Sequence, residues 1–434
     1  MRAMKDSGIP WIGEIPKDWK VMKLRNLGKF SASGIDKKVV EDEPLVRIIN
    51  YVDIYKNTNK ELWEQNYMVV SAPAEKCQEH QVNVGDMFFT PSSETIEDIG
   101  VSAVVMEELA NTAFSYHIIR FQPTTDIDFN FRKYITNNTA CLNYFSSCAT
   151  GSIRKTISRD VFKECIVLLP PLAEQQRIAE FLDRKCAEVD EMIALQEQII
   201  EELKAYKQSV ITEAVTKGLN PDVPMRDSGI EWIGEIPEHW DIVTPKALFS
   251  QRKEKAKEGQ KQLTSSQQYG ILYQDEYSEI TGNKVVVVMK DFDILKQVQA
   301  GDFVISMRSF QGGLEYSTKT GSISSAYVML IPNLDYVYPR FYRWLFKSIC
   351  YINALQSTSN MVRDGQAMRF SNFAQVPLYQ VPLKEQESIA DYLDEKCADI
   401  DKLIQTKQEK IESLKEYKKS IIYEYVTGKR EITE

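Results

Sequence analysis

The chain has 434 residues, about three times the ~150 residues of a typical domain, so two or more domains are expected. With 43% hydrophobic and 26% charged residues, and no apolar run near the ~18 residues of a membrane helix, the composition excludes disordered, collagen-like and membrane-spanning chains. The formal net charge of −9 argues against nucleic-acid binding, and seven cysteines without a Cys-x-x-Cys pair indicate reduced thiols in a cytoplasmic protein.

The first element along the chain is a short box, residues 6–20 (DSGIPWIGEIPKDWK). It returns at residues 227–241 (DSGIEWIGEIPEHWD) with 11 of 15 positions identical. We expect Trp11, Trp19, Trp232 and Trp240 to anchor each box against a helix or a domain edge. The alternative is that these tryptophans bind a partner, because Trp is enriched at interface hot spots.

Two variable regions, residues 21–170 and 242–381, follow the two boxes. Short β-branched and aromatic runs bounded by turn signals, such as residues 118–121 and 285–289, predict strands in both regions. A turn and strand at residues 85–89 has a weaker copy at residues 301–305. The two regions are therefore predicted to share one α+β fold with different loops.

The segments 171–218 and 382–429 are identical at 24 of 48 positions and predict two long helices. Pro171 and Pro382 precede them, and Glu174 and Glu385 fall in the first turn, where acidic groups suit the helix dipole. Apolar or small residues at heptad spacing indicate a coiled coil. The predicted seam consists of Ala179, Leu182, Cys186, Val189, Ile193, Ile200, Leu203 and Val210, and of Ala390, Leu393, Cys397, Ile400, Ile404, Ile411, Leu414 and Ile421.

Polar residues interrupt this seam at two pairs of equivalent positions, Gln196 with Lys407 and Lys207 with Lys418. They either extend outward to solvent or fix the register of the helices. Cys186 and Cys397 are interpreted as small core residues. Asp183 and Asp394, each two residues before a lysine, superficially resemble nuclease triplets but are interpreted as part of a solvated helix face, because positions i and i+2 do not share a face.

The repeat arithmetic predicts how the helices run. Eight residues, 219–226, join the first helix to the second box, and joining the chain ends would link the second helix to the first box by about as many. The chain therefore resembles a ring of two equal halves. Such a ring requires antiparallel helices, with both termini near the first box.

Charge is unevenly distributed along the chain. Residues 174–217 hold 6 basic and 10 acidic groups, and residues 384–430 hold 10 and 11, so more than half of the net −9 lies on the predicted helices. Residues 246–261 instead hold 6 basic and 2 acidic groups. This stretch is a candidate phosphate-contact patch, although a solvated charge run is an equal alternative.

Catalytic motifs are missing from the sequence. It contains no Gly-x-Gly-x-x-Gly and no phosphate-binding P-loop, and His80, His117 and His239 lack partners at metal-ligand spacing. We therefore expect no catalytic residue, no metal site and no cofactor in this chain.

Two variable regions on near-identical helices, each helix entered through Pro-Leu-x-Glu-Gln-x-x-Ile-Ala or a close variant of it, resemble the specificity subunit of type I restriction–modification enzymes. The Trp-Ile-Gly-x-Ile-Pro-x-x-Trp boxes are similar to those of the family. Gln386-Glu387-Ser388 departs from the usual Gln-x-Arg. The likeness spans essentially the whole chain.

The resemblance implies a non-catalytic subunit that reads a bipartite double-stranded DNA target in the cytoplasm of a bacterium or archaeon. The implied fold is α+β, with two similar target-recognition domains joined by two long antiparallel coiled-coil helices in a pseudo-twofold, circular repeat. Its domains would be residues 1–170, the first helix 171–218, residues 219–381 and the second helix 382–430. The implied partners are two modification (methyltransferase) subunits, which bring S-adenosylmethionine, and restriction (translocase/nuclease) subunits, which bring ATP hydrolysis.

Candidate DNA contacts are side chains able to reach base edges or phosphates. In the first domain they are Arg47, Asn50, Tyr51, Ser92, Ser93, Arg154 and Lys155. In the second they are Arg252, Lys253, Lys255, Lys257, Lys261, Gln267, Gln268, Arg308, Ser309, Gln311, Arg363 and Arg369. An ordinary exposed surface residue remains the alternative for each of them.

Two other classes of protein stay open at this point. A structural coiled-coil interaction protein without nucleic-acid binding explains the helices, but not why the two modules diverged on a constant frame. A self-contained nuclease or methyltransferase would need cofactor loops, which the sequence lacks.

Overall fold

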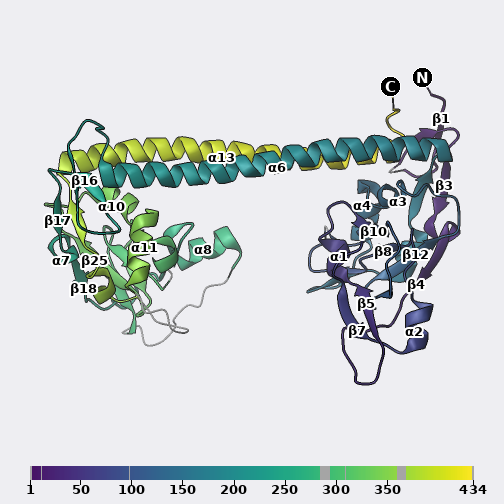
Figure 1. Ribbon diagram of the computed structural model, residues 1–434, viewed down its shortest axis with the longest axis horizontal. Helices are drawn as coiled ribbons and strands as arrows, with labels where there is room; N and C mark the ends of the chain where they lie inside the picture. Colours follow the sequence, from purple (N-terminus) through teal and green to yellow (C-terminus); the bar gives the residue numbers. More distant parts are fainter. Residues whose placement is uncertain are drawn as a thin grey trace. The chain divides into compact units, whose positions relative to one another are not determined.

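The computed structural model describes residues 2–10, 12–96, 98–283, 294–307, 309–358 and 368–432, without the side chain of Phe310. Trp11, Arg308, Arg363 and the strand predicted at residues 285–289 lie outside the described residues. The chain forms two compact units, one from residues 1–196 and 409–434 and the other from residues 197–408 (Figure 1). Each unit thus combines one variable region with part of both long helices.

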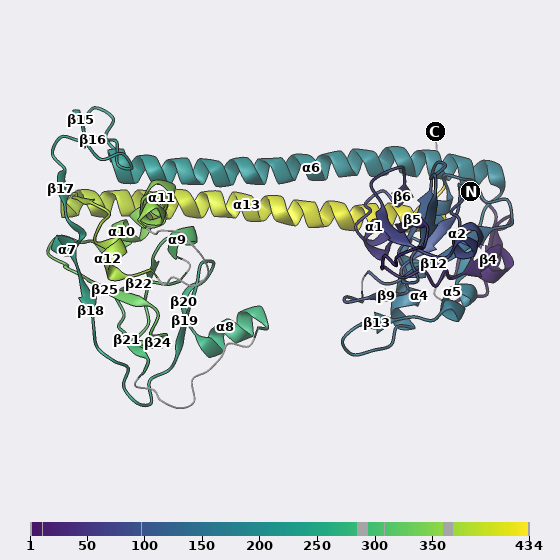
Figure 2. The same ribbon diagram turned by 60° about the horizontal axis from the view of Figure 1, so that its bottom comes forward.

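The long helices are α6 (Leu172–Lys217) and α13 (Leu383–Val426). In the first unit the beginning of α6 packs with the end of α13, since Leu182 and Ile421 share one core. In the second unit the end of α6 shares a core with the beginning of α13, through Val210 and Leu393. Figure 2 shows the two helices side by side in both units. The antiparallel pairing predicted from the repeat is confirmed.

The predicted seam of the helices is largely buried. Cys186 and Cys397 are buried, as are eleven of the other predicted seam residues. Ile193, Leu203 and Ile404 are partly exposed. Two seam lysines form ion pairs across the helices: Lys418 with Asp190 at 2.6 Å in the first unit, and Lys207 with Asp401 at 2.7 Å in the second. These pairs favour the interpretation that polar seam residues fix the register.

The start of each long helix fastens the short box. Glu174 accepts a hydrogen bond of 2.9 Å from Trp19 Nε1, and Glu385 accepts one of 3.1 Å from Trp240 Nε1. Both indoles are buried, so the predicted anchoring role is confirmed for them. The neighbouring Gln175 and Gln386 are also buried, and their side-chain amides satisfy backbone groups of adjacent loops.

In the first unit, the described strands form a five-stranded sheet in the order β4-β12-β8-β10-β6. Its strands are antiparallel except for the β10–β6 pair. A separate three-stranded sheet has the order β11-β5-β7, with β11 parallel and β7 antiparallel to β5. The strands are β4 (Gly28–Ser31), β5 (Leu45–Ile49), β6 (Glu61–Leu62), β7 (Met68–Ser71), β8 (Met87–Phe89), β10 (Ser102–Val105), β11 (Thr112–Phe114) and β12 (Ile119–Pro123).

The second unit repeats the central strands of this arrangement. Its described strands include a four-stranded antiparallel sheet in the order β18-β25-β22-β23, where β25 lies between β18 and β22 as β12 lies between β4 and β8. These strands are β18 (Phe249–Arg252), β22 (Phe303–Ile305), β23 (Glu315–Tyr316) and β25 (Val328–Pro332). The unit also contains two separate strand pairs. They are the hairpin of β19 (Leu263–Ser266) with β20 (Gly270–Tyr273), and the pair of β21 (Lys296–Val298) with β24 (Gly321–Ile323). The predicted common α+β fold is confirmed.

Short strand pairs close each box, join the segment after each box to the strand before a long helix, and link two segments of the first variable region. They are β1 (Met4–Asp6) with β2 (Glu14–Pro16), β3 (Lys20–Lys23) with β14 (Ile166–Leu169), β9 (Ser92–Ser93) with β13 (Lys155–Thr156), β15 (Met225–Asp227) with β16 (Glu235–Pro237), and β17 (Asp241–Val243) with β26 (Leu378–Gln380).

Each unit also contains short helices. In the first unit they are α1 (Tyr51–Tyr55), α2 (Ala74–Glu79), α3 (Arg132–Ile135), α4 (Thr139–Ser147), α5 (Arg159–Glu164) and the 3₁₀ turn η1 (Leu24–Asn26). In the second they are α7 (Pro245–Leu248), α8 (Gln274–Thr281), α9 (Ser309–Gly312), α10 (Pro339–Leu345), α11 (Ile349–Ser357) and α12 (Phe370–Phe373).

Both chain ends lie at the first box. Near the C-terminus, Lys429 donates through Nζ to the carbonyl oxygens of Ile12 and Glu14. Near the N-terminus, Arg2 pairs with Asp18 and Glu174. Gly428, with φ of +70°, lies against Pro16 and Trp19, as Gly218, with φ of +76°, lies near Trp240. The predicted meeting of the termini is therefore confirmed.

Candidate nucleic-acid interface

Three separate segments of the first unit bring candidate DNA contacts together. Tyr51 Oη donates to Ser93 Oγ at 3.3 Å, and the Arg154 guanidinium lies 5.7 Å from the centre of the Tyr51 ring. Lys155 lies opposite Ser93 where β13 pairs with β9. Arg154 is exposed and Tyr51 is half-buried. The result is a surface patch, which we call the Tyr51 patch, in which the Tyr51 ring, Arg154 and Lys155 are suited to base edges and phosphates, while the buried Ser93 supports the Tyr51 hydroxyl.

Two further basic side chains adjoin the Tyr51 patch. The pKa of His117 is lowered first by burial and then by the positive charges of Lys37 and Arg154, against the opposing charge of Asp36, so all three groups lie within electrostatic range of His117. His117 precedes the central strand β12, and Lys37 is exposed. The sequence did not reveal either as a contact, because isolated residues form no pattern.

Other candidates in the first domain support the fold. Asn50 caps α1, accepting from the backbone N–H of Tyr51 at 2.8 Å, while Asp53 accepts from the backbone of Asn50. Arg47 forms an ion pair with Glu64 and donates to the carbonyl of Ala110. We leave Asn50 and Arg47 out of the DNA-contact set because their polar groups already have partners.

In the second unit, the turn of the β19–β20 hairpin meets α9. Gln267 and Gln268 are exposed at this turn. The side chain of Gln267 lies so close to α9 that a Cβ added at Gly312 would be 2.8 Å from it. Gln311 of α9 is exposed, whereas Ser309 is buried and its Oγ accepts from the backbone of Ser306. Gln267, Gln268 and Gln311 are thus gathered, and Ser309 belongs to the fold.

The basic stretch after β18 divides into two groups. Lys253, Lys255 and Lys257 are exposed and form no ion pair within the described residues. Lys261 pairs with Asp275 at 3.3 Å and lies over the Tyr273 ring. Lys253, Lys255 and Lys257 therefore remain available to phosphates, and Lys261 is partly engaged.

Arg252 of this stretch has a structural partner. Its Nε and Nη2 donate to both carboxylate oxygens of Asp302 at 2.7 and 2.9 Å, and both side chains are buried. The pKa of Arg252 is raised, first by its hydrogen bond to Asp302. Because this bidentate pair occupies the guanidinium, we leave Arg252 out of the DNA-contact set.

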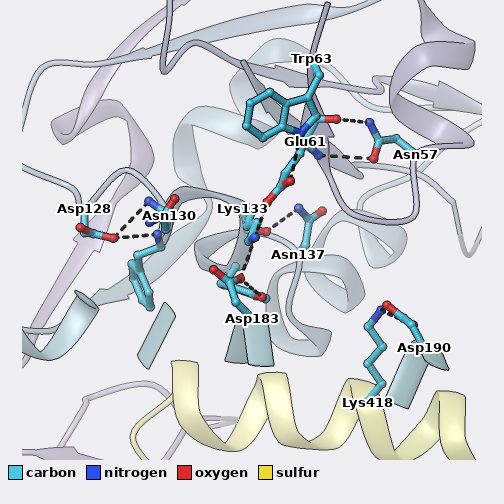
Figure 3. A network of polar contacts seen from close by, with 12 residues as sticks. Asn57, Glu61, Trp63, Asp128, Asn130, Lys133, Asn137, Asp183, Asp190 and Lys418 are labelled. Atoms are coloured by element: carbon cyan, nitrogen blue, oxygen red, sulfur yellow. Dashed lines mark hydrogen bonds and ion pairs between the residues drawn. The ribbon is translucent and has the colours of Figure 1, made fainter. Parts of the chain in front are cut away.

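An acidic residue of each long helix fastens the recognition domain. In the first unit, Lys133 of α3 bridges Asp183 of α6, at 2.7 Å, and Glu61 of β6, as Figure 3 shows. Tyr134 also donates to Asp183, at 2.5 Å. The interpretation of Asp183 as part of a solvated helix face was wrong, because it missed that a domain packs on this face.

The second unit has the same device. Asp394, the equivalent of Asp183, accepts from Arg340 Nε at 2.9 Å, from Arg343 at 2.6 Å and from Trp344 Nε1 at 2.8 Å. Burial opposes its ionisation, but these donors prevail and the pKa of Asp394 is lowered. The prediction for Asp394 was wrong for the same reason. Each domain is held to the helices by charged hydrogen bonds at one fixed position.

A surface hollow repeats at equivalent positions of the two units. In the first unit, a hollow of about 560 Å³ lies between α4 and α13, and in the second a hollow of about 840 Å³ lies between α11 and α6. The lining residues correspond across the repeat: Asn143 with Asn353, Lys419 with Gln208, and Tyr423 with Thr212. We call these two surfaces the paired hollows.

Within the part of the chain that the structure describes, no three His, Cys, Asp or Glu side chains are grouped so as to hold a metal ion. No helix in the same residues has the length and apolar character needed to cross a membrane.

Comparisons with known proteins agree with this geometry. Residues 16–205 match a family model described as a type I restriction modification DNA specificity domain. A putative type I restriction enzyme specificity subunit of Methanocaldococcus jannaschii, MjaX, is 25% identical over 429 residues, covering 96% of this chain and 95% of that protein.

Two solved structures have a similar fold. A chain from a structure describing complex assembly and conformational transition of the type I R-M system gives a TM-score of 0.70 at 15% identity, covering 96% of this chain and 99% of that one. The HsdS subunit from Thermoanaerobacter tengcongensis gives 0.51 at 14% identity, covering 96% and 98%.

Proposed function

This chain belongs to the DNA specificity subunits of type I restriction–modification systems, and we propose that each of its two units reads one half of a split duplex DNA sequence. The Tyr51 patch carries this proposal for the first half, because it joins Tyr51, Arg154 and Lys155 from distant segments on one surface, with the buried Ser93 beneath them. Gln267, Gln268 and Gln311 supply the corresponding amides for the second half. A purely structural coiled-coil protein is thereby set aside.

The specificity subunit is a non-catalytic subunit, so the chemistry belongs to its partners. Our proposal is that two modification subunits, carrying S-adenosylmethionine for adenine methylation, dock on this chain, and that restriction subunits add ATP-driven cleavage. The paired hollows support two equivalent docking positions, because corresponding residues line them in both units. This chain itself then holds neither cofactor.

The test is to assemble the chain with its modification subunits and map the methylated sequence. Replacing residues 21–170 by the variable region of another family member should change one half of the recognised sequence and leave the other. The reciprocal replacement of residues 242–381 is the matched control and should change the opposite half. Loss of recognition at both halves by a folded, assembled variant would contradict the proposal.

Single substitutions refine the same experiment. Arg154→Gln and Lys155→Gln should weaken DNA binding, whereas Arg47→Gln, which removes an arginine paired with Glu64, should leave the recognised sequence unchanged. If Arg47→Gln altered the recognised bases while Arg154→Gln did not, the Tyr51 patch would be the wrong surface.

A further inference from the structure

A second surface feature of the second unit remains without a role. It is a hollow of about 780 Å³ between the start of α7, strand β18, strand β21, the segment before β25 and helix α12. Three basic residues line it, each from a different segment: Lys246, Lys296 and Arg369. The neutral polar side chains of Gln251, Ser325, Ser371 and Gln375 also face it. We call this surface the cationic hollow.

The charge of the cationic hollow is uncompensated. No acidic residue is among its lining residues, and none of the three cations forms an ion pair within the described residues. Lys296 donates through Nζ to the carbonyl of Tyr327 at 2.7 Å, which leaves its charge without a carboxylate, and burial lowers its pKa. Three cations around one hollow without an acidic lining residue attract an anion, even in a chain of net charge −9.

The position of the hollow has a counterpart in the first unit. Phe89 and Ile305 are equivalent, because each ends the repeated turn and strand at residues 85–89 and 301–305. Phe89 pairs with Ile119 of β12, and Ile305 pairs with Val328 of β25, so these two strands and residues also correspond. Ser325 and Ala326, which line the hollow, therefore correspond to Tyr116 and His117 of the first unit. There, His117 lies within electrostatic range of Lys37 and Arg154. Both units thus place cations at the start of the central strand.

The cations at this shared position are not equivalent in sequence. Counting from the long-helix repeat, Arg369 corresponds to Ser158. Counting from the boxes, Lys246 corresponds to Arg25, which is also basic but pairs with Glu164 and does not belong to the Lys37 and Arg154 group of the first unit. The basic stretch of the second unit reaches the same place, because the backbone of Lys255 bridges to that of Lys296. Different residues therefore place cations near the start of the central strand in both units, as expected when the ligand's charge is constant and its sequence is not.

We propose that the cationic hollow is the phosphate-contact site of the second unit, where Lys246, Lys296 and Arg369 hold consecutive backbone phosphates beside the bases that this unit reads. This inference rests on the proposed function. Ammonium and guanidinium groups bind phosphate oxygens regardless of base, and the neutral amides and hydroxyls add hydrogen bonds without repelling them. The site sets position and affinity, and the choice of bases lies elsewhere.

The experiment measures how DNA binding by the assembled complex depends on salt. Each phosphate contact contributes about −0.9 to the slope of log K against log salt concentration. The triple variant Lys246→Gln, Lys296→Gln, Arg369→Gln should make the slope shallower by about 2 to 3 and weaken binding by roughly 10- to 100-fold. The loss should be the same on a cognate and an unrelated duplex, and the methylated sequence should not change.

A matched control removes the same charge elsewhere. Lys384, Lys402 and Lys410 are exposed on α13, and changing all three to Gln lowers the net charge equally. This control should leave the slope near that of the parent complex. If the triple variant fails to fold, the single variants at the exposed Lys246 and Arg369 serve instead, each reducing the slope by about 1.

The outcomes separate the proposals. An unchanged slope, or a change equal to that of the control, overturns the phosphate site. Altered methylated bases overturn it in favour of base reading. Binding of ATP by the parent complex without DNA, lost in the triple variant while the DNA slope stays unchanged, would reassign the hollow to a free nucleotide. If the parent complex binds no duplex DNA, the proposed function fails instead.

Discussion

The two units bury an acidic side chain at the same place and neutralise it from different strands. In the first unit, Asp86 lies 3.7 Å from Arg120 of β12, which also donates to Ser31 of β4. In the second unit, the equivalent Asp302 is held by Arg252 of β18. Arg120 of β12 faces Ser31 of β4, and at the equivalent place Met329 of β25 faces Arg252 of β18. The arginine therefore lies on the central strand in the first unit and on the neighbouring outer strand in the second.

This difference teaches what the two units have in common. The fold requires a positive charge beside a buried carboxylate, because a buried charge without a partner is strongly destabilising. It does not require that charge on a particular strand, since facing residues of a strand pair reach the same place. The pairs differ in geometry: burial lowers the pKa of Arg120, whereas the hydrogen bond to Asp302 raises that of Arg252.

The largest effect is expected from removing the acid of the closer pair. Asp302→Ala leaves the buried Arg252 with one exposed partner, Glu254, and should destabilise the second unit by about 3–5 kcal/mol. Asp86→Ala should cost less, because Arg120 keeps Ser31 and the carbonyl of Gln81. Hydrogen exchange of the β22 and β25 amides, compared with those of β8 and β12, measures each unit separately. Equal losses in both units would contradict the comparison.

A smaller effect is expected when the arginine is moved instead of removed. Arg252→Ser leaves Asp302 unpaired, and adding Met329→Arg recreates the arrangement of the first unit. The double variant should recover about 1–3 kcal/mol of the stability lost by Arg252→Ser, as coupled neighbours do. Denaturant unfolding followed by hydrogen exchange supplies both values. A double variant no more stable than Arg252→Ser would show that the strand of origin matters.

The buried glutamines at the helix starts predict a difference of the next size. Gln386 donates to the carbonyls of Val381 and Tyr336 and accepts from the backbone of Tyr338, whereas Gln175 makes two such contacts. Gln386→Ala should therefore destabilise its unit by about 2 kcal/mol, and Gln175→Ala by somewhat less. Thermal unfolding with exchange at the flanking loops measures this. Gln196→Ala, at a partly exposed seam position, is the control and should cost little.

The smallest effect is expected from reconnecting the chain. A version with its termini joined and cut within residues 219–226 should fold with nearly unchanged stability and assemble and bind DNA as before, because the termini already meet at the first box. Cutting within α6 is the contrasting control and should prevent folding. Failure of the first version to assemble would mean that the two linkers are not interchangeable.

The recognition surfaces show where sequence reasoning reached its limit. The choice of Tyr51, Ser93, Arg154 and Lys155 rested on their chemistry alone. They lie close together because β13 pairs with β9, and no local sequence pattern predicts this pairing. Residues 246–261 form a basic stretch in the sequence, but Arg252 is not available to DNA because it is bound to the buried Asp302. Lys246 and Lys296 lie 50 residues apart, and their meeting at one hollow follows from the sheet and not from spacing.

What the sequence determined by itself was the frame. The repeated boxes, the heptad spacing and the linkers of similar length required two antiparallel helices. Helical periodicity is a local signal, and a closed repeat is possible only if the helices run in opposite directions. The tertiary structure decided what each polar residue does. In the sequence, Asp183 resembles its exposed neighbour Glu180, and Arg252 resembles its exposed neighbour Lys253. In the structure they differ, because Asp183 binds Lys133 of the recognition domain and Arg252 binds the buried Asp302. A charge faces solvent or a partner according to long-range packing, which a single sequence does not display.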